Sequence, residues 1–168
     1  MIIGLDPGTD RSAYVCYDAI GRRIEAHGLL LNDPLLMALG NMGPCQLVIE
    51  QFENYGMAVG RDVFATVWWS GRFFQAWDGP AAQLPRKTVK LHICGSTRAT
   101  DANVRQALID RFGRSKAEAI GTKTHKGPLY GLKSHEYAAL AVAMTWAETH
   151  PVGVPVGPLV YPATRGIS

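Results

Sequence analysis

With 168 residues, the chain is long enough for one domain with a sizeable core and short for two. Its content of 47% hydrophobic and 18% charged residues is typical of a globular protein and excludes a low-complexity chain. No apolar run approaches the roughly 20 residues of a membrane-spanning helix, and Cys16, Cys45 and Cys94 lack metal-ligand spacing. We therefore expect a cytoplasmic protein with reduced thiols and no membrane contact.

The first third of the chain predicts a sheet. Residues 1–6, 12–17 and 24–31 have the apolar patterns of strands, and their short connections favour an antiparallel meander. A short helix is predicted over 33–39 and a fourth strand over 46–50. Because a helix precedes the fourth strand, that strand can lie parallel to the first one.

The next segment, 61–77, predicts a helix that is apolar on most of its sides. One stripe of aromatic side chains repeats every four residues, and a second stripe runs beside it: Trp69, Phe73 and Trp77, then Phe64 and Trp68. Such a helix must be covered on most sides. One face can pack on the sheet, and the other is either enclosed within the same chain or covered by a second subunit.

The remaining elements are a fifth strand over 88–93, a helix over 101–112 capped by Asp101, a loop over 121–131 and a final helix that is capped by Ser134 and ends at about 149. The element order predicts an α/β fold. Its mixed five-stranded sheet would have three antiparallel strands followed by parallel strands, with helices on both faces. We expect residues 1–150 to form this domain and the Pro- and Gly-rich residues 151–168 to form an extended tail.

Charge is distributed unevenly along the chain. The overall net charge is +3, but residues 86–133 carry eleven Lys or Arg against three acids. The rest of the chain carries six basic and eleven acidic residues. A basic segment on an acidic body suggests a polyanionic partner, with nucleic acid as the first candidate. The alternative is a solvated surface that binds nothing.

Two acids stand at the ends of apolar strands. Asp6 closes the first strand and Glu50 the fourth, and neighbouring strands would bring them side by side as a site for magnesium. A third polar pair, His135 and Glu136, begins the final helix, where the helix dipole favours a neutral imidazole and an anionic carboxylate. The alternatives are that Asp6 organises a turn before Pro7, and that the other three have ordinary structural roles.

These motifs resemble the RNase H-like nuclease fold, and within it the RuvC family of Holliday junction resolvases. Four stretches carry the resemblance in order, over roughly residues 1–147: Ile3 to Thr9, Val48 to Gln51, Lys90 to Leu108, and Ser134-His135 with the following apolar helix. Cys94-Gly95-Ser96 and Gly127 to Gly131 look most like resolvases carried by bacteriophages or prophages.

The resemblance implies a crossover junction endodeoxyribonuclease that hydrolyses phosphodiesters with two Mg²⁺ ions per active site, Mn²⁺ being able to substitute. Its catalytic and metal-binding residues would be Asp6, Glu50, His135 and Glu136. It would act as a homodimer that nicks four-way or branched DNA symmetrically, leaving a 5′-phosphate and a 3′-hydroxyl. The expected DNA-binding residues combine aromatic and basic side chains: Phe52, Tyr55, Arg86, Lys87, Lys90, Arg98, Arg105 and Lys133. Phe52 could instead pack into the core.

The chain departs from the family pattern at two places. RuvC proteins usually place two metal-binding residues three apart on the last helix, and Ala138 stands where the second would follow His135. Glu136 is the candidate substitute, although it lies about 100° around the helix. Asp101 stands near a place where the family has basic residues.

Other functions stay open at this stage. The chain could be a module that binds branched DNA without cutting it, or an RNase H-like nuclease that acts on RNA. A less favoured alternative is a lobe of an actin-like ATPase, whose phosphate-binding turn resembles Gly4 to Thr9.

Overall fold

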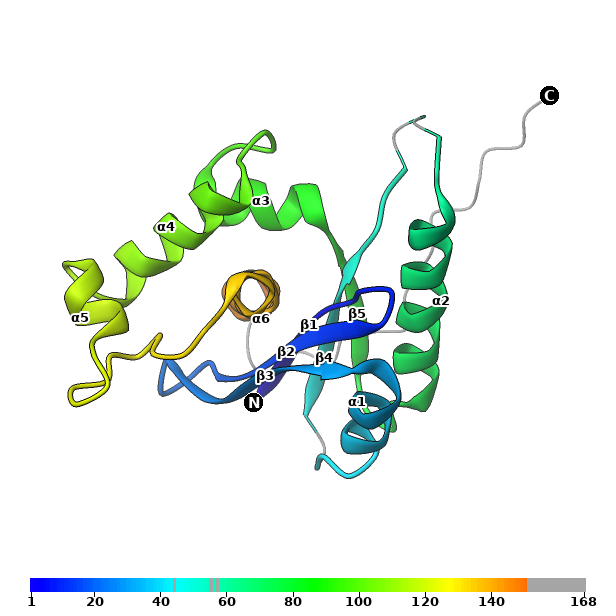
Figure 1. The fold of residues 1–168 in the computed structure, drawn as a ribbon, viewed down its shortest axis with the longest axis horizontal. Coiled ribbons are helices and arrows are strands. Elements are labelled where there is room, and N and C mark those ends of the chain that lie inside the picture. The colour runs from blue at the N-terminus through cyan, green and yellow to red at the C-terminus, as the bar shows by residue number, and fades with distance from the viewer. Residues whose placement is uncertain (44, 55, 57, 151–168) are drawn as a thin grey trace.

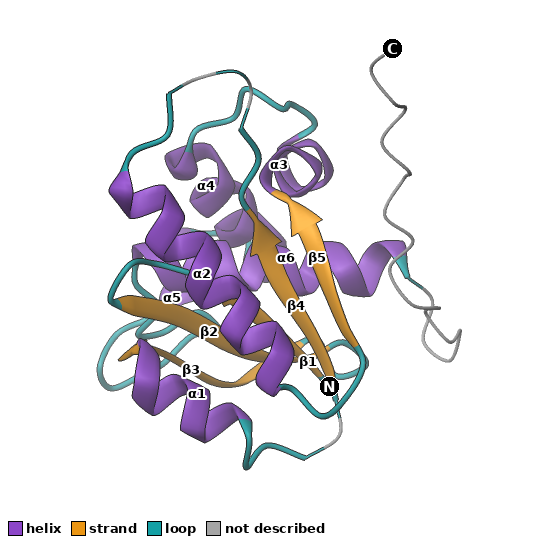
Figure 2. Cartoon of the chain, turned by 90° about the vertical axis from the view of Figure 1, so that its right-hand side faces the viewer, coloured by secondary structure: helices purple, strands orange, loops and turns teal. Residues whose placement is uncertain are grey.

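The computed structural model describes residues 1–43, 45–54, 56 and 58–150. Its single sheet has the strand order β3-β2-β1-β4-β5 (Figure 2). The strands are β1 (Ile2–Asp6), β2 (Arg11–Asp18), β3 (Arg23–Leu31), β4 (Gln46–Gln51) and β5 (Ala81–Pro85). The first three strands pair antiparallel, whereas β4 pairs parallel to β1 and β5 parallel to β4. The predicted mixed five-stranded sheet and RNase H-like α/β fold are therefore confirmed.

One face of the sheet is covered by α1 (Asn32–Leu39) and α2 (Arg61–Ala76) (Figure 1). Successive strand residues point to opposite faces, so Ile3 and Leu5 turn towards these helices. They form a core with Leu47 and Ile49 of β4, and with Phe73 of α2.

Four helices lie on the opposite side of the sheet: α3 (Arg86–Cys94), α4 (Asp101–Phe112), α5 (Lys116–Ile120) and α6 (Ser134–Thr149), with α6 between the strands and the helices α4 and α5 (Figure 1). The central helix of this layer is α6, which is buried over most of its length and packs on β1 and β2. Its backbone comes very close to β1. A Cβ atom on Gly4 would lie 2.1 Å from the carbonyl oxygen of Ala139 and 2.9 Å from the Cβ of Ala143. Because glycine has no side chain, Gly4 allows the backbone of α6 to pack directly against β1.

The strand predicted over 88–93 is wrong, because this segment belongs to α3 and the fifth strand is β5. The apolar residues Val89, Leu91 and Ile93 alternate as in a strand, but Val89 and Ile93 are also spaced for one face of a helix. The structure buries Val89 and Ile93 and leaves Leu91 53% exposed, which is the helical outcome.

Two predicted helix caps are also wrong. Thr100, not Asp101, caps α4 through a hydrogen bond that its side chain accepts from the backbone N–H of Asn103. At α6 the cap position is Lys133, and Ser134 is the first helical residue. The carboxylate of Glu136 accepts the backbone N–H of Lys133, which is one half of a capping box; the other half is absent, because the ammonium group of Lys133 cannot accept a hydrogen bond.

The α2 helix is only half covered. Phe73 is buried on the sheet, whereas Phe64, Val67 and Trp68 are 65%, 49% and 58% exposed. Within the described part of the chain, the alternative that α2 is enclosed by its own chain is therefore wrong. The predicted tail, 151–168, lies outside the described residues.

Among the described residues, none of the helices combines the length and apolar character that crossing a membrane requires.

Substituting Gly4 with Ala should destabilise the fold, because the added methyl group would collide with the backbone of α6. Overpacking of this kind costs about 1–3 kcal/mol, and each kcal/mol corresponds to about 2–4 °C in Tm for a chain of this size. Thermal unfolding followed by circular dichroism measures the effect. Gly40→Ala is the matched control, because a Cβ there makes only ordinary contacts, 3.6 Å from the nearest atom. An equal drop in Tm for both variants would contradict the packing argument.

Candidate active site

Two carboxylates meet at the carboxyl ends of the central parallel strands. Asp6 is the last residue of β1, and the pairing of Leu5 with Ile49 places Glu50 of β4 beside it. Their side chains are only 11% and 12% exposed. The two acids therefore lie side by side, as predicted, and both are largely shielded from water.

Burial has an electrostatic cost for both acids, because a desolvated carboxylate favours its protonated form. It raises the pKa of Asp6, and the hydrogen bond and positive charge of His135 oppose this effect. Burial and the neighbouring Asp6 carboxylate raise the pKa of Glu50 to about 7, against the lowering effect of Arg86.

His135 joins this pair from the first turn of α6. A hydrogen bond of 3.0 Å connects its Nδ1 to Oδ2 of Asp6, and its side chain is 68% exposed. The imidazole thus contacts the buried carboxylate while remaining open to a substrate. The prediction that the start of the last helix meets the end of the first strand agrees with this geometry.

The structure does not bring Glu136 to the carboxylate pair. Its buried side chain lies 2.9 Å, Oε1 to Nδ1, from His27 of β3, and it also accepts the backbone N–H of Lys133. Neighbouring positions on a helix point about 100° apart. The side chain of Glu136 therefore points towards β3, whereas that of His135 points towards Asp6 at the end of β1. Glu136 anchors the start of α6 to β3 and lies outside the cluster that it was expected to complete.

An arginine pairs with the second carboxylate. The two terminal nitrogens of Arg86, the first residue of α3, lie 2.8 Å from Oε2 of Glu50 and 2.6 Å from Oδ1 of Asp101. Lys90, one turn further along α3, has its Nζ 3.8 Å from the same Asp101 oxygen. Asp101 is thus the partner of two cations at the start of α4, a role that its position in the sequence did not suggest.

The carboxylates form part of the wall between two adjoining hollows, of about 190 Å³ and 440 Å³. Both hollows are lined by Asp6, Pro7, Glu50, Arg86 and Lys90. The smaller hollow continues between α3, α4 and α6, where Ser134 lines it, and adds residues that were not predicted to belong to a site: Arg11, Val89, Val104, Tyr137 and Ala141. Arg11, which follows the turn after Asp6, is the cation among them, and only its closeness to that turn could have pointed to it.

The larger hollow gathers several of the predicted DNA-binding residues. Phe52 and Lys87 line it together with Arg86 and Lys90. Phe52 is 44% exposed, so the alternative that it packs in the core is wrong. Tyr55 lies outside the described residues.

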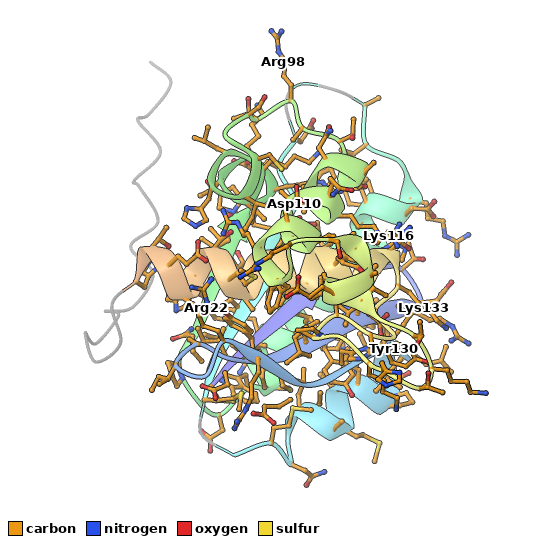
Figure 3. The ribbon with its side chains drawn as sticks, turned by 90° about the vertical axis from the view of Figure 1, so that its left-hand side faces the viewer. Arg22, Arg98, Asp110, Lys116, Tyr130 and Lys133 are labelled. Atoms are coloured by element: carbon orange, nitrogen blue, oxygen red, sulfur yellow. The ribbon has the colours of Figure 1, made fainter. Side chains whose placement is uncertain are left out.

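The other predicted DNA-binding residues do not gather at the hollows. Arg98 points outward from the loop between α3 and α4, and Lys133 lies at the start of α6 (Figure 3). The guanidinium carbon of Arg105 lies 5.1 Å from the ring centre of Tyr137. For these three residues a DNA contact stays a prediction.

The donor set fits a divalent cation only after a rearrangement. Over the described residues, no three His, Cys, Asp or Glu side chains are already arranged to hold a metal ion. The oxygens of Asp6 and Glu50 are the hard donors that magnesium prefers, and the imidazole of His135 is bonded to one of them. The burial cost of two adjacent carboxylates is the kind of cost that a bound cation relieves.

The raised pKa of Glu50 predicts a stability effect in the metal-free protein. The folded state holds the Glu50 proton up to about pH 7, whereas the unfolded state loses it near 4.5, so ionised Glu50 disfavours folding as the pH rises between these values. We expect Glu50→Gln to raise the Tm by several degrees at pH 8 in EDTA, with the gain disappearing by pH 4.5. Asp78→Asn, at an exposed position, is the control for loss of a charge. A Glu50→Gln gain that does not depend on pH would contradict this explanation.

Comparison with known proteins supports the fold. No protein-family model and no curated protein sequence matches the chain. Among solved structures, it is similar to Thermus thermophilus RuvC, with a TM-score of 0.59 and 18% identity over 88% of this chain and 95% of that one. It is also similar to T. thermophilus RuvC in complex with Holliday junction substrate, with a TM-score of 0.59 and 19% identity over 87% and 92% of the two chains. At this identity the likeness concerns the architecture, and the chain has a RuvC-like fold.

Proposed function

We propose that this protein is a metal-dependent endonuclease that cleaves four-way or otherwise branched DNA. The observation that carries the proposal is the buried pair Asp6 and Glu50, joined by His135 and opening into hollows lined by Arg86 and Lys90. Paired carboxylates beside cations suit the hydrolysis of a phosphodiester, whose negative charge must be bound and whose water must be activated. The comparison structure with Holliday junction substrate supports a junction as the DNA partner.

The chemistry follows from the donor set. A water oxygen forms a bond to phosphorus, the bond from phosphorus to the 3′-oxygen breaks, and that oxygen takes up a proton, leaving a 5′-phosphate and a 3′-hydroxyl. After a rearrangement of their side chains, Asp6, Glu50 and His135 would hold a divalent cation, Mg²⁺ or in its place Mn²⁺. When bound, such a cation neutralises charge on the phosphate and lowers the pKa of the attacking water. His135, exposed and bonded to Asp6, is also placed to orient that water.

The larger hollow provides a surface for DNA. Lys87 and Lys90 line it beside the exposed ring of Phe52. Lysine side chains bind backbone phosphates without sequence preference, and an aromatic ring can stack on a base that has left its helix, worth about 1–3 kcal/mol per base. This combination suits a substrate whose bases are unstacked at a branch point.

The half-covered helix α2 supports a homodimer. Symmetric nicks in two strands require two active sites related by a two-fold axis. Phe64, Val67 and Trp68 form an exposed apolar patch on α2, and the guanidinium of Arg72 lies 4.8 Å from the ring centre of Trp68. We assign this patch to the interface between two copies. A phage or prophage origin and a cytoplasmic location are part of the same proposal.

The first test is cleavage of a synthetic four-way junction by Asp6→Asn and Glu50→Gln. We expect each substitution to lower the cleavage rate by at least 10²–10³-fold, because each removes a carboxylate that would hold the divalent cation, and that cation would stabilise the charge of the transition state. Junction binding should persist, since the basic surface is unchanged. Product analysis on denaturing gels, with Mg²⁺ or EDTA, gives the rates, and Asp78→Asn is the control variant.

The same assay distinguishes the alternatives. Either variant cutting at the wild-type rate would contradict the proposal. A wild-type protein that binds junctions but never cuts them would be a recognition module, and cleavage of RNA in preference to DNA would indicate an RNA nuclease. If the protein neither binds nor cleaves the junction, a nucleotide-binding function would have to be tested instead.

The dimer proposal predicts that Trp68→Glu gives a monomer, because it buries a charge in the apolar patch. Light scattering during gel filtration measures the mass, and nicks in the two strands of a junction should become uncoupled. Ile20→Glu is the matched control, since Ile20 is 84% exposed in the connection between β2 and β3. The interface lies elsewhere if Trp68→Glu remains a dimer.

A further inference from the structure

The active site already contains a cation that belongs to the chain. Arg86 follows directly after β5, and Leu84 of β5 is paired with Glu50 of β4. This register delivers the guanidinium to the edge of the sheet where the carboxylates end, and hydrogen bonds fix it between Glu50 and Asp101. Each bond uses a different terminal nitrogen, so the planar group is held in one orientation.

The pairing with Glu50 has a clear physical reason. A nearly buried carboxylate next to Asp6 is costly unless a positive charge compensates it, and Arg86 lowers the pKa of Glu50 against the effect of burial. The side chain of Asp101 is 76% exposed. It binds the second terminal nitrogen of the same guanidinium, so Arg86 is shared between Glu50 and Asp101. Arg86 itself remains 41% exposed and lines both hollows, so it is open to a substrate phosphate with donors to spare.

The remaining donors suit one divalent cation better than two. The acids that line the smaller hollow are Asp6, Glu50 and Asp101, and the last two are bound to Arg86; the larger hollow adds one acid, Glu53, from the loop after β4. From α6, His135 is hydrogen-bonded to Asp6, and Ser134 and Tyr137 line the hollow with neutral hydroxyl groups, while Ala138 and Ala141 line it without a donor atom. Magnesium requires near-octahedral oxygen coordination, and a second ion would have to compete with Arg86 for Glu50.

We propose that each active site works with one divalent cation, held by Asp6, Glu50 and His135, and that the guanidinium of Arg86 takes the place of a second cation by binding the scissile phosphate. This inference rests on the nuclease function proposed above and replaces the two-ion site expected from the sequence. Arginine is suited to the task, because its fork of N–H groups matches two phosphate oxygens and keeps its charge at any working pH. Arg86 is then a catalytic residue rather than one of several general DNA contacts.

The test combines metal binding with cleavage, using the full chain and Mn²⁺ as the probe. Titration followed by the electron paramagnetic resonance signal of free Mn²⁺ should give one bound ion per wild-type chain. Arg86→Gln should bind Mn²⁺ as tightly or more tightly, because a competing cation is gone, yet cut junctions at least 100-fold more slowly at saturating Mn²⁺. Arg86→Lys should recover part of the rate. Arg114→Gln removes the same charge from the basic segment at an exposed position and should change neither quantity.

Three results would overturn the inference. These are two Mn²⁺ ions per wild-type chain, cleavage by Arg86→Gln within threefold of wild type, or a defect in Arg86→Gln that higher Mn²⁺ concentration repairs. The last result would show that Arg86 only supports a metal ligand. Failure of the nuclease function itself is distinguished by Asp6→Asn, because an unchanged rate in that variant refutes the proposed site whatever Arg86 does.

Discussion

The central constraint in this structure is the parallel pairing of β1 with β4, which places two carboxylates side by side in a poorly hydrated position. Neither Asp6 nor Glu50 can avoid the other, since the register of their strands is fixed by the buried residues before them. Adjacent buried carboxylates oppose folding when both are ionised. The groups around them supply the compensation, and each has a specific origin in the fold.

The compensation for Asp6 depends on the placement of α6. The absence of a side chain at Gly4 lets this helix lie directly on β1, and Glu136 fixes its first turn by binding His27 and the backbone of Lys133. These contacts lie away from the carboxylates, yet they determine where His135 stands. A residue that was expected to bind metal therefore has a positioning role, which follows from its side of the helix.

Sequence reasoning succeeded where local pattern and strand topology agree. The ends of the first and fourth strands had to meet once the intervening helix made them parallel, and the polar start of the last helix faces the same edge. It failed at β5, whose sequence Ala81-Ala82-Gln83-Leu84-Pro85 has a weak strand pattern next to the stronger alternation of 88–93. That error hid the pairing of Arg86 with Glu50, because the pairing depends on β5 ending beside β4. The partners of Asp101 and the scatter of Arg98, Arg105 and Lys133 depend on tertiary packing that no local pattern records.

The same charge relations explain why an acid lies within the basic segment. Asp101 is exposed and would repel a phosphate if it stood alone, but it lies within reach of both Arg86 and Lys90. Three charged groups on α3 and α4 are thereby held together at the mouth of the hollows without a large excess of positive charge. A basic surface with no such acid would bind any duplex through its phosphates. Here Arg86 and Lys90 are paired with acids, so a phosphate has to come close enough to reach the donors of Arg86 that those pairs leave over. Under the proposed nuclease function, such a site would favour a backbone that is bent into the hollow, as at a branch point, over one that passes across the surface.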